Sequence, residues 1–160
     1  TASNSASLSY TSFSASSYQT YMLVFEDIWP SAAGNDFWVE GSVNGSTYGA
    51  LWTYSQTNFT STTVGANVGT TQTDAVLCPN VGTTNLAGVG GTAYLHFGVA
   101  ANQRARLQGQ FGWSSNGPSR YISLFNGYYD NATALTSLKF LFGVGNIASG
   151  TIRIYGLQKS

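Results

Sequence analysis

The chain is a succession of short segments in which apolar and polar residues alternate, and most segments end at a cluster of Gly, Asn, Pro or Ser. Strict alternation places successive side chains on opposite faces of an extended strand, so it predicts half-buried β-strands. Such segments recur at roughly ten-residue spacing, and no stretch has the apolar spacing of an amphipathic helix. We therefore expect an all-β fold, an antiparallel two-sheet sandwich of about nine to eleven strands with jelly-roll-like topology.

The first strong segment, Tyr18–Trp29, is apolar at most of its positions. A strand that is apolar on both faces is expected in the centre of a sheet. Regular alternation along this segment predicts that Phe25 and Ile28 point to opposite faces.

The next two segments, Phe37–Val43 and Tyr48–Tyr54, flank the dipeptide Asn44-Gly45. This dipeptide tolerates positive φ at both central positions of a tight turn, so the two segments are predicted to form a β-hairpin. Residues 57–73 are rich in Thr and are expected to form an edge strand followed by a loop.

The second half of the chain contains five further strand signals. They are Thr92–Val99, Arg104–Trp113, Ser119–Asn126, Leu135–Val144 and Thr151–Leu157. Alternation predicts that Leu107, Phe111 and Trp113 face inward. It places Tyr94, Gln108 and Tyr155 at outward positions. Residues 18–160 are expected to form a single β-sandwich domain, since 160 residues suffice for one domain of ordinary size. The Ser- and Ala-rich segment 1–17 fits either a linker from a longer parent chain or a first strand.

The composition excludes several classes of protein. Only 8% of the residues are charged and 14% are aromatic, whereas disordered chains are charge-rich and aromatic-poor. The formal net charge is +0, so the chain lacks the basic surface of a nucleic-acid-binding protein. No apolar run approaches the roughly 20 residues of a membrane span. We therefore expect neither nucleic-acid binding nor membrane insertion.

The neutral sum hides a division of charge along the chain. Residues 1–100 contain five acidic residues and no Lys or Arg, which gives −5, and residues 101–160 contain six basic residues and one acidic residue, which gives +5. Either the two halves complement each other within one chain, or an acidic face of one copy meets a basic face of the next copy in a homo-oligomer. The residues expected at such a subunit interface are Glu26, Glu40, Arg104, Arg106 and Arg153.

Few residues of the chain suit catalysis. Glu26 and Glu40 lie on neighbouring predicted strands and are the best candidates for the carboxylate pair of a glycoside hydrolase, although outward charges that keep a sheet soluble explain them more simply. His96 is predicted at an outward position in mid-strand, and no nucleophile motif accompanies it. Cys78 is expected to be a buried structural thiol. With one cysteine and one histidine, we expect no catalytic residue, no cofactor and no metal site.

What the sequence offers instead is aromatic and amide surface at strand ends and in loops. The densest segment is Phe125–Asn131, which fits either a tight turn with core-packed tyrosines or a contact surface for a sugar or receptor. Aromatic rings hold the apolar faces of sugars, and Asn, Asp and Arg side chains hydrogen-bond to sugar hydroxyls. The candidate glycan-binding residues are Trp52, Arg120, Asn126, Tyr128, Tyr129 and Asp130.

Three stretches carry a resemblance to a known family. They are YxxYxLxFxxIxP at residues 18–30, FxV and SxNGxxY within residues 37–48, and SGTIRIYGLQK at residues 149–159. Over most of residues 18–159, with the exception of residues 57–91, the chain resembles the C-terminal β-sandwich modules of bacteriophage tail fibres, tailspikes and related virion proteins. The resemblance implies a jelly-roll domain, commonly a homotrimer, on the virion surface in contact with the extracellular medium. It also implies binding to bacterial surface polysaccharide or to other virion proteins, and it brings no catalytic residues.

Three functions remain open on these grounds. The first is a non-enzymatic phage module that binds a host receptor glycan, trimerises the fibre, or does both. The second is a capsid decoration or structural assembly protein without a glycan site. The third is a polysaccharide depolymerase, which would need Glu26 and Glu40 to converge in a groove.

Overall fold

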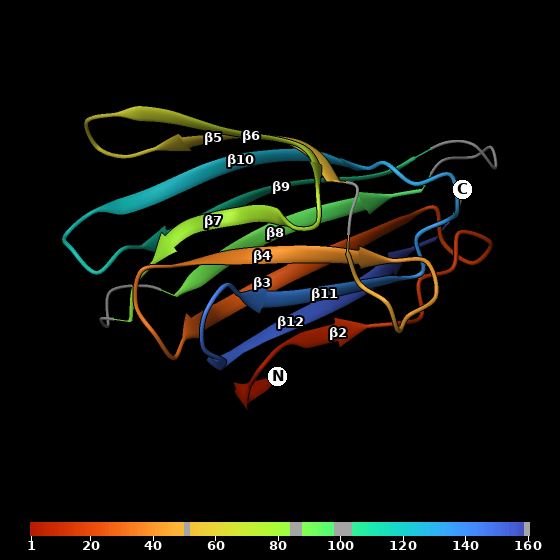
Figure 1. Cartoon of the computed structure of the whole chain (residues 1–160), viewed down its shortest axis with the longest axis horizontal. Helices are drawn as coiled ribbons and strands as arrows, with labels where there is room; N and C mark the ends of the chain where they lie inside the picture. The colour runs from red at the N-terminus through yellow and green to blue at the C-terminus, as the bar shows by residue number, and fades with distance from the viewer. Residues whose placement is uncertain (50–51, 84–87, 98–103, 159–160) are drawn as a thin grey trace.

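The computed structural model describes residues 1–49, 52–83, 88–97 and 104–158, and these ranges contain twelve β-strands (Figure 1). The strands are β1 (Ala2–Ser5), β2 (Leu8–Tyr10), β3 (Thr20–Pro30), β4 (Asn35–Ser42), β5 (Trp52–Phe59), β6 (Val64–Gln72), β7 (Ala75–Val81), β8 (Val89–His96), β9 (Ala105–Ser114), β10 (Arg120–Tyr129), β11 (Ser137–Phe142) and β12 (Ile147–Leu157). Within the described ranges, no helix is long and apolar enough to cross a membrane.

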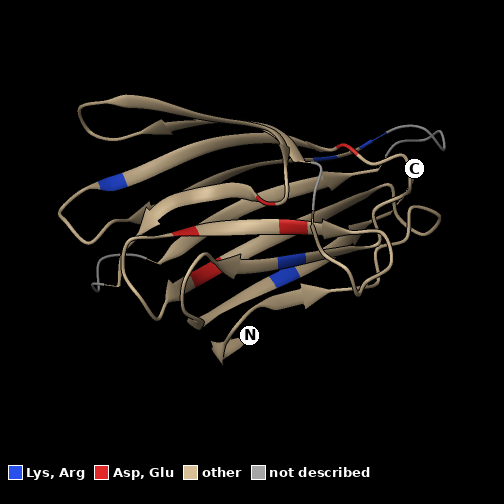
Figure 2. Cartoon of the chain, in the orientation of Figure 1, with Lys and Arg blue, Asp and Glu red and all other residues tan. Residues whose placement is uncertain are grey.

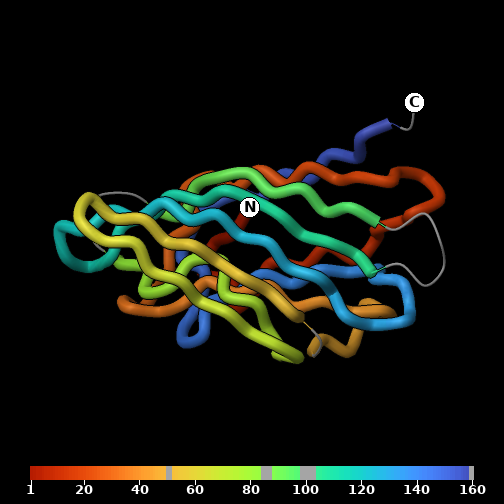
Figure 3. The backbone as a smooth tube through the Cα atoms, turned by 90° about the horizontal axis from the view of Figure 1, so that it is seen from above, coloured from red at the N-terminus to blue at the C-terminus, as the bar shows by residue number. Residues whose placement is uncertain are grey.

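The strands form two antiparallel sheets, which confirms the predicted all-β sandwich. The large sheet has the order β1-β12-β3-β8-β9-β10-β5-β6, and the small sheet has the order β2-β11-β4-β7. Figure 3 shows β8, β9 and β10 of the large sheet running side by side along the molecule. Residues 1–17, which fitted either a linker or a strand, contribute β1 and β2. The predicted segment 92–99 ends outside the described residues.

Three long-range strand pairs are nested in chain order: β3 with β12, β4 with β11, and β5 with β10. The first and third pairs lie in the large sheet and the second lies in the small sheet. Nested pairs that alternate between two layers are how a jelly roll is wound. This winding brings the basic second half of the chain beside the acidic first half.

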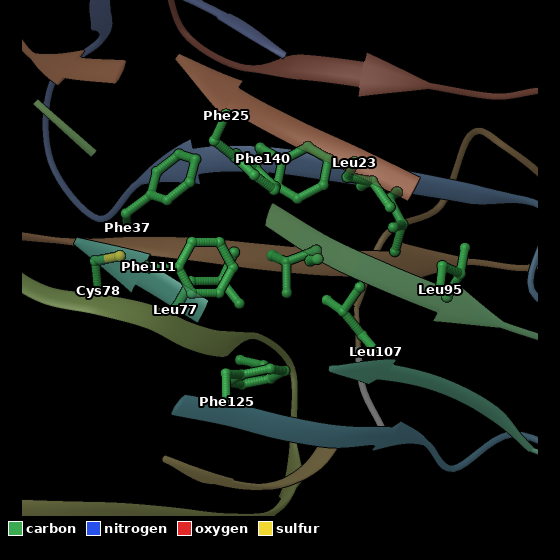
Figure 4. Close-up of a cluster of buried hydrophobic side chains, with 14 of the residues drawn as sticks. Leu23, Phe25, Phe37, Leu77, Cys78, Leu95, Leu107, Phe111, Phe125 and Phe140 are labelled. Atoms are coloured by element: carbon green, nitrogen blue, oxygen red, sulfur yellow. The ribbon is translucent and has the colours of Figure 1, made fainter. Parts of the chain in front are cut away.

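The inner faces of the two sheets pack into one aromatic core. The ring centroid of Phe25 on β3 lies 5.3 Å from that of Phe111 on β9 and 5.3 Å from that of Phe140 on β11, so the contacts join both sheets (Figure 4). The predicted inward alternation on β9 is confirmed, because Leu107, Phe111 and Trp113 are all buried. Aromatic pairs of this kind stabilise a core beyond the burial of their area.

One prediction about β3 is wrong, because Phe25 and Ile28 both face the core, with exposed fractions of 2% and 0%. The pairing of β3 with β8 shifts register between these two residues. Asp27 between them has a φ of 47°, in the left-handed region. The extra residue of this β-bulge turns both apolar side chains inward and leaves Asp27 exposed. The central position predicted for β3 is confirmed, since it lies between β12 and β8.

The hairpin predicted at Asn44-Gly45 is also wrong. A tight turn does form there, since Gly45 has a φ of 73° and Oδ1 of Asn44 accepts hydrogen bonds from the N–H groups of Ser46 and Thr47. However, β4 lies between β11 and β7 in the small sheet, and β5 lies between β10 and β6 in the large sheet. The turn therefore begins a crossover between the two layers.

Candidate functional site

Four of the six ligand-binding residues predicted from the sequence lie on β10, and the structure separates them by face. Most of the segment Phe125–Asn131, which was expected as a turn or contact surface, is regular strand as far as Tyr129. Alternation along this strand turns Arg120, Asn126 and Tyr128 to solvent and Tyr129 to the core. The side chain of Tyr128 is 45% exposed.

Trp52 and Tyr129 are not surface residues, so the prediction that they contact a glycan is wrong. Their exposed fractions are 0% and 2%. They face each other in the pairing of β5 with β10, and their ring centroids are 5.5 Å apart. The Tyr129 ring lies directly over Gly41 of the small sheet, where a Cβ atom would collide with it. Both rings therefore hold the two sheets together.

A row of side chains crosses the outer face of the large sheet, the face turned away from the small sheet. We call it the outer-face row: Tyr155, Met22, Tyr94, Gln108 and Asn126, which lie opposite one another on β12, β3, β8, β9 and β10. Four spacings of about 4.8 Å between strands make this row about 19 Å long. Tyr94 and Tyr155 are 37% and 45% exposed, so their rings are open to a ligand.

A second row runs beside the first and consists of Thr20, His96, Arg106 and Tyr128. The Arg106 guanidinium carbon lies 5.0 Å from the centroid of the Tyr128 ring. Nδ1 of His96 is hydrogen-bonded with Oγ1 of Thr20 at 3.1 Å. Burial and the Arg106 charge lower the pKa of His96. The outward position predicted for His96 is confirmed, although its side chain is half-buried.

Most residues expected at a subunit interface form contacts within the chain. Figure 2 shows basic positions on β11 and β12 near acidic positions on β4 and β3. Arg153 is paired with Glu26 on the outer face of the large sheet. Nζ of Lys139 lies 2.5 Å from Oε2 of Glu40, directly opposite it in the pairing of β11 with β4. The structure therefore supports charge complementarity between the two halves of the chain at these positions.

Arg104 and Asp130 form the third ion pair, with 2.8 Å between Nε and Oδ1. Asp130 follows β10 directly and is exposed. The Asp130 carboxylate, which the sequence assigned to glycan binding, is thus engaged by Arg104. Both side chains remain partly open to solvent.

Glu26 and Glu40 do not lie on neighbouring strands, so their predicted juxtaposition is wrong. Glu26 is on β3 in the large sheet and Glu40 is on β4 in the small sheet. Each faces outward, where a basic residue of its own sheet pairs with it. The two carboxylates therefore lie on opposite outer faces of the sandwich and cannot converge on one glycosidic bond.

Cys78 on β7 is fully buried, as the sequence predicts, and burial raises the pKa of its thiol well above the usual value. In the part of the chain that the structure describes, no three His, Cys, Asp or Glu side chains cluster in a way that could hold a metal ion.

Of the five residues in the outer-face row, only Asn126 was among the ligand-binding residues predicted from the sequence, and Met22, Tyr94, Gln108 and Tyr155 were missed. Tyr94, Gln108 and Tyr155 were each expected at an outward position of their own strand, but the pairing of strands distant in the chain is what aligns them. The sequence did contain one signal for these residues: an aromatic or amide side chain at an outward position of an alternating strand, where a small polar residue would be enough for solubility.

Comparison of the chain with protein-family models, with curated proteins and with solved structures returned no match.

Proposed function

We propose that the protein is a non-enzymatic module of a bacteriophage virion that binds a glycan of the bacterial surface through the outer face of its large sheet. The observation that carries this proposal is the outer-face row, which aligns two exposed tyrosine rings, Met22 and two amide side chains across five strands. Aromatic rings suit the apolar faces of sugars, and amides supply directional hydrogen bonds to hydroxyls. The resemblance of the sequence to phage fibre and tailspike modules supports the same function.

The neighbouring residues extend this surface. Tyr128 is exposed on β10, two residues beyond Asn126, and Arg106 lies against the Tyr128 ring. A guanidinium group held on a ring offers fixed hydrogen-bond donors to a sugar. The opposite placement of Glu26 and Glu40 supports a binding role rather than a depolymerase.

In this proposal the module is a homotrimer at the virion surface. A single shallow face gives weak binding, and several linked copies raise the effective concentration of the remaining sites. The proposal thus requires a weak glycan site on each copy and an oligomer that presents several of these sites together.

A matched pair of variants tests the glycan site. Tyr94 and Tyr18 are 37% and 38% exposed, but only Tyr94 lies in the outer-face row. We expect Tyr94→Ala to weaken binding to host cells and to an array of bacterial surface oligosaccharides at least several-fold, and Tyr18→Ala to leave binding unchanged. Equal binding by both variants, or no saccharide binding by the wild-type protein, would contradict the proposal.

A second candidate is a structural assembly protein that uses the same face to pack against virion protein. It is favoured by apolar side chains at the β6 edge of the large sheet, where Val64 and Val68 are 69% and 77% exposed and Leu124 on β10 is 47% exposed. No charged residue or proline protects β6 from pairing with another strand. Sedimentation equilibrium separates the candidates. Loss of self-association by Val68→Lys with unchanged saccharide binding would assign this edge to assembly.

A further inference from the structure

Two hollows adjoin at one end of the outer face, beside the β9–β10 and β5–β6 turns. The first is about 300 Å³ and is lined by residues of β8, β9 and β10, among them Gly90, Gly112 and Gln110. The second is about 370 Å³ and is lined by residues that include Phe59 and Arg120. Ile122 lines both hollows, so we describe them together as the Ile122 groove.

The floor of this groove exists because two facing residues lack side chains. Gly90 and Gly112 are register partners on β8 and β9. A Cβ atom on Gly112 would lie 3.7 Å from the carbonyl oxygen of Tyr121, and one on Gly90 would lie 3.8 Å from the carbonyl oxygen of Phe25. These are ordinary contacts, so packing does not require glycine at either position. Glycine inside a strand is costly and often marks a place where a ligand approaches the backbone.

Arg120 lines the second hollow, and none of the described carboxylates forms an ion pair with it. Arg104, Lys139 and Arg153 are each paired with a carboxylate, and Arg106 lies against a ring. Of the Lys and Arg side chains in the described residues, Arg120 alone has neither an ion pair nor a ring contact. It is exposed on the same face of β10 as Ile122. A guanidinium group in this state is available to bind a carboxylate or phosphate with two parallel hydrogen bonds.

The remaining lining completes a site for a sugar. Phe59 offers an aromatic ring that is 37% exposed, and Ile122 is 51% exposed. Gln110 contributes an amide, and Thr60 and Ser61 contribute hydroxyl groups. A mostly apolar wall with a few polar groups and one charge is the usual composition of a small-molecule site.

We infer that the Ile122 groove binds a saccharide that carries an oxyanion, with the sugar ring over Phe59 and Ile122 and the carboxylate or phosphate on Arg120. This inference rests on the proposed glycan-binding function and names the chemical class of its ligand. A neutral saccharide would leave the guanidinium without its partner, so the groove should prefer the anionic form.

The test is an oligosaccharide array in which uronic-acid and sugar-phosphate oligosaccharides are each printed beside their neutral counterparts, made by carboxyl reduction or dephosphorylation. We expect the wild-type protein to prefer anionic forms, and the carboxylate and phosphate arms to show which oxyanion is bound. Arg120→Gln should lower affinity for the anionic form about tenfold or more, because a hydrogen bond to a charged group is lost. Arg120→Lys should lose less affinity than Arg120→Gln, because lysine keeps the positive charge but lacks the paired N–H donors of the guanidinium group. Lys139→Gln is the control, because it makes the same change in net charge on the small sheet.

A second variant, Gly112→Thr, fills the groove without touching Arg120. The space at Gly112 accepts a Cβ atom, and threonine has a higher β-strand propensity than glycine. The melting temperature should therefore not fall. Binding of the anionic saccharide should be lost. If Gly112→Thr and Arg120→Gln bind like the wild-type protein while Tyr94→Ala does not, the inference is wrong and the proposed function stands. If the wild-type protein binds no saccharide, both are wrong.

Discussion

Tyr128 and Tyr129 are neighbours in sequence with identical side chains, and β10 turns them to opposite faces. Their exposed fractions are 45% and 2%. Substituting each by Ala therefore tests the placement of the candidate surface. Tyr129→Ala removes a ring that packs on Trp52 and on the backbone of Gly41. Truncating a buried aromatic residue to Ala costs about 3–5 kcal/mol of unfolding free energy, which lowers the melting temperature of a domain of this size by roughly 6–20 °C.

Tyr128→Ala removes only an exposed ring and its contact with Arg106. An exposed cation–π contact is worth about 0.5–1 kcal/mol, so the melting temperature should fall by roughly 1–4 °C. Thermal and urea unfolding followed by circular dichroism measure both variants, with Tyr129→Phe as the control that keeps the buried ring. Equal losses of stability, or a larger loss for Tyr128→Ala, would refute the assignment of these residues to core and surface.

Three further outcomes follow from the packing and the titratable groups. Gly41→Val should unfold the protein or cost several kcal/mol, because its Cβ would collide with the Tyr129 ring; a urea midpoint equal to wild type would contradict this. The thiol of Cys78 should react with a thiol reagent only in denaturant, because burial both shields it and raises its pKa; rapid labelling of the native protein would count against that placement. Burial and the Arg106 charge lower the pKa of His96 in the folded state, so the unfolded chain binds more protons between the two pKa values. Unfolding free energy should therefore fall as the pH drops through about 6.5, and His96→Gln should flatten that part of the profile in urea titrations; an unchanged slope would argue against it.

The strands were predictable where alternation is uninterrupted, because a strand buried on one face has apolar residues at every second position. On β9 the pattern identifies Leu107, Phe111 and Trp113 as core residues, and all three are buried. The bulge in β3 could not be predicted in this way. One inserted residue, Asp27, reverses the face of every residue after it.

The end of β10 was misplaced because Asn126-Gly127 has the composition of a turn. In the structure Gly127 stays within the strand, and a Cβ atom there would lie 2.9 Å from Cζ of Phe125. Glycine at this position makes room for an aromatic ring of the core rather than for a reversal of the chain. A turn and a close-packed aromatic ring can both require glycine. The sequence is the same in the two cases, and only the packing shows which one applies.

Strand partners are set by contacts between residues far apart in the chain, and this is why the candidate site was only partly predictable. Asn126, Tyr94 and Tyr155 are each ordinary outward residues on their own strands. The nested pairing of β3 with β12, and the placement of β8 and β9 between β3 and β10, align them on one face. The same pairing sets Gly90 opposite Gly112 and so opens the Ile122 groove beside Arg120. A binding surface on a sheet is thus a property of register, and its ligand is chosen by the side chains, or missing side chains, that register brings together.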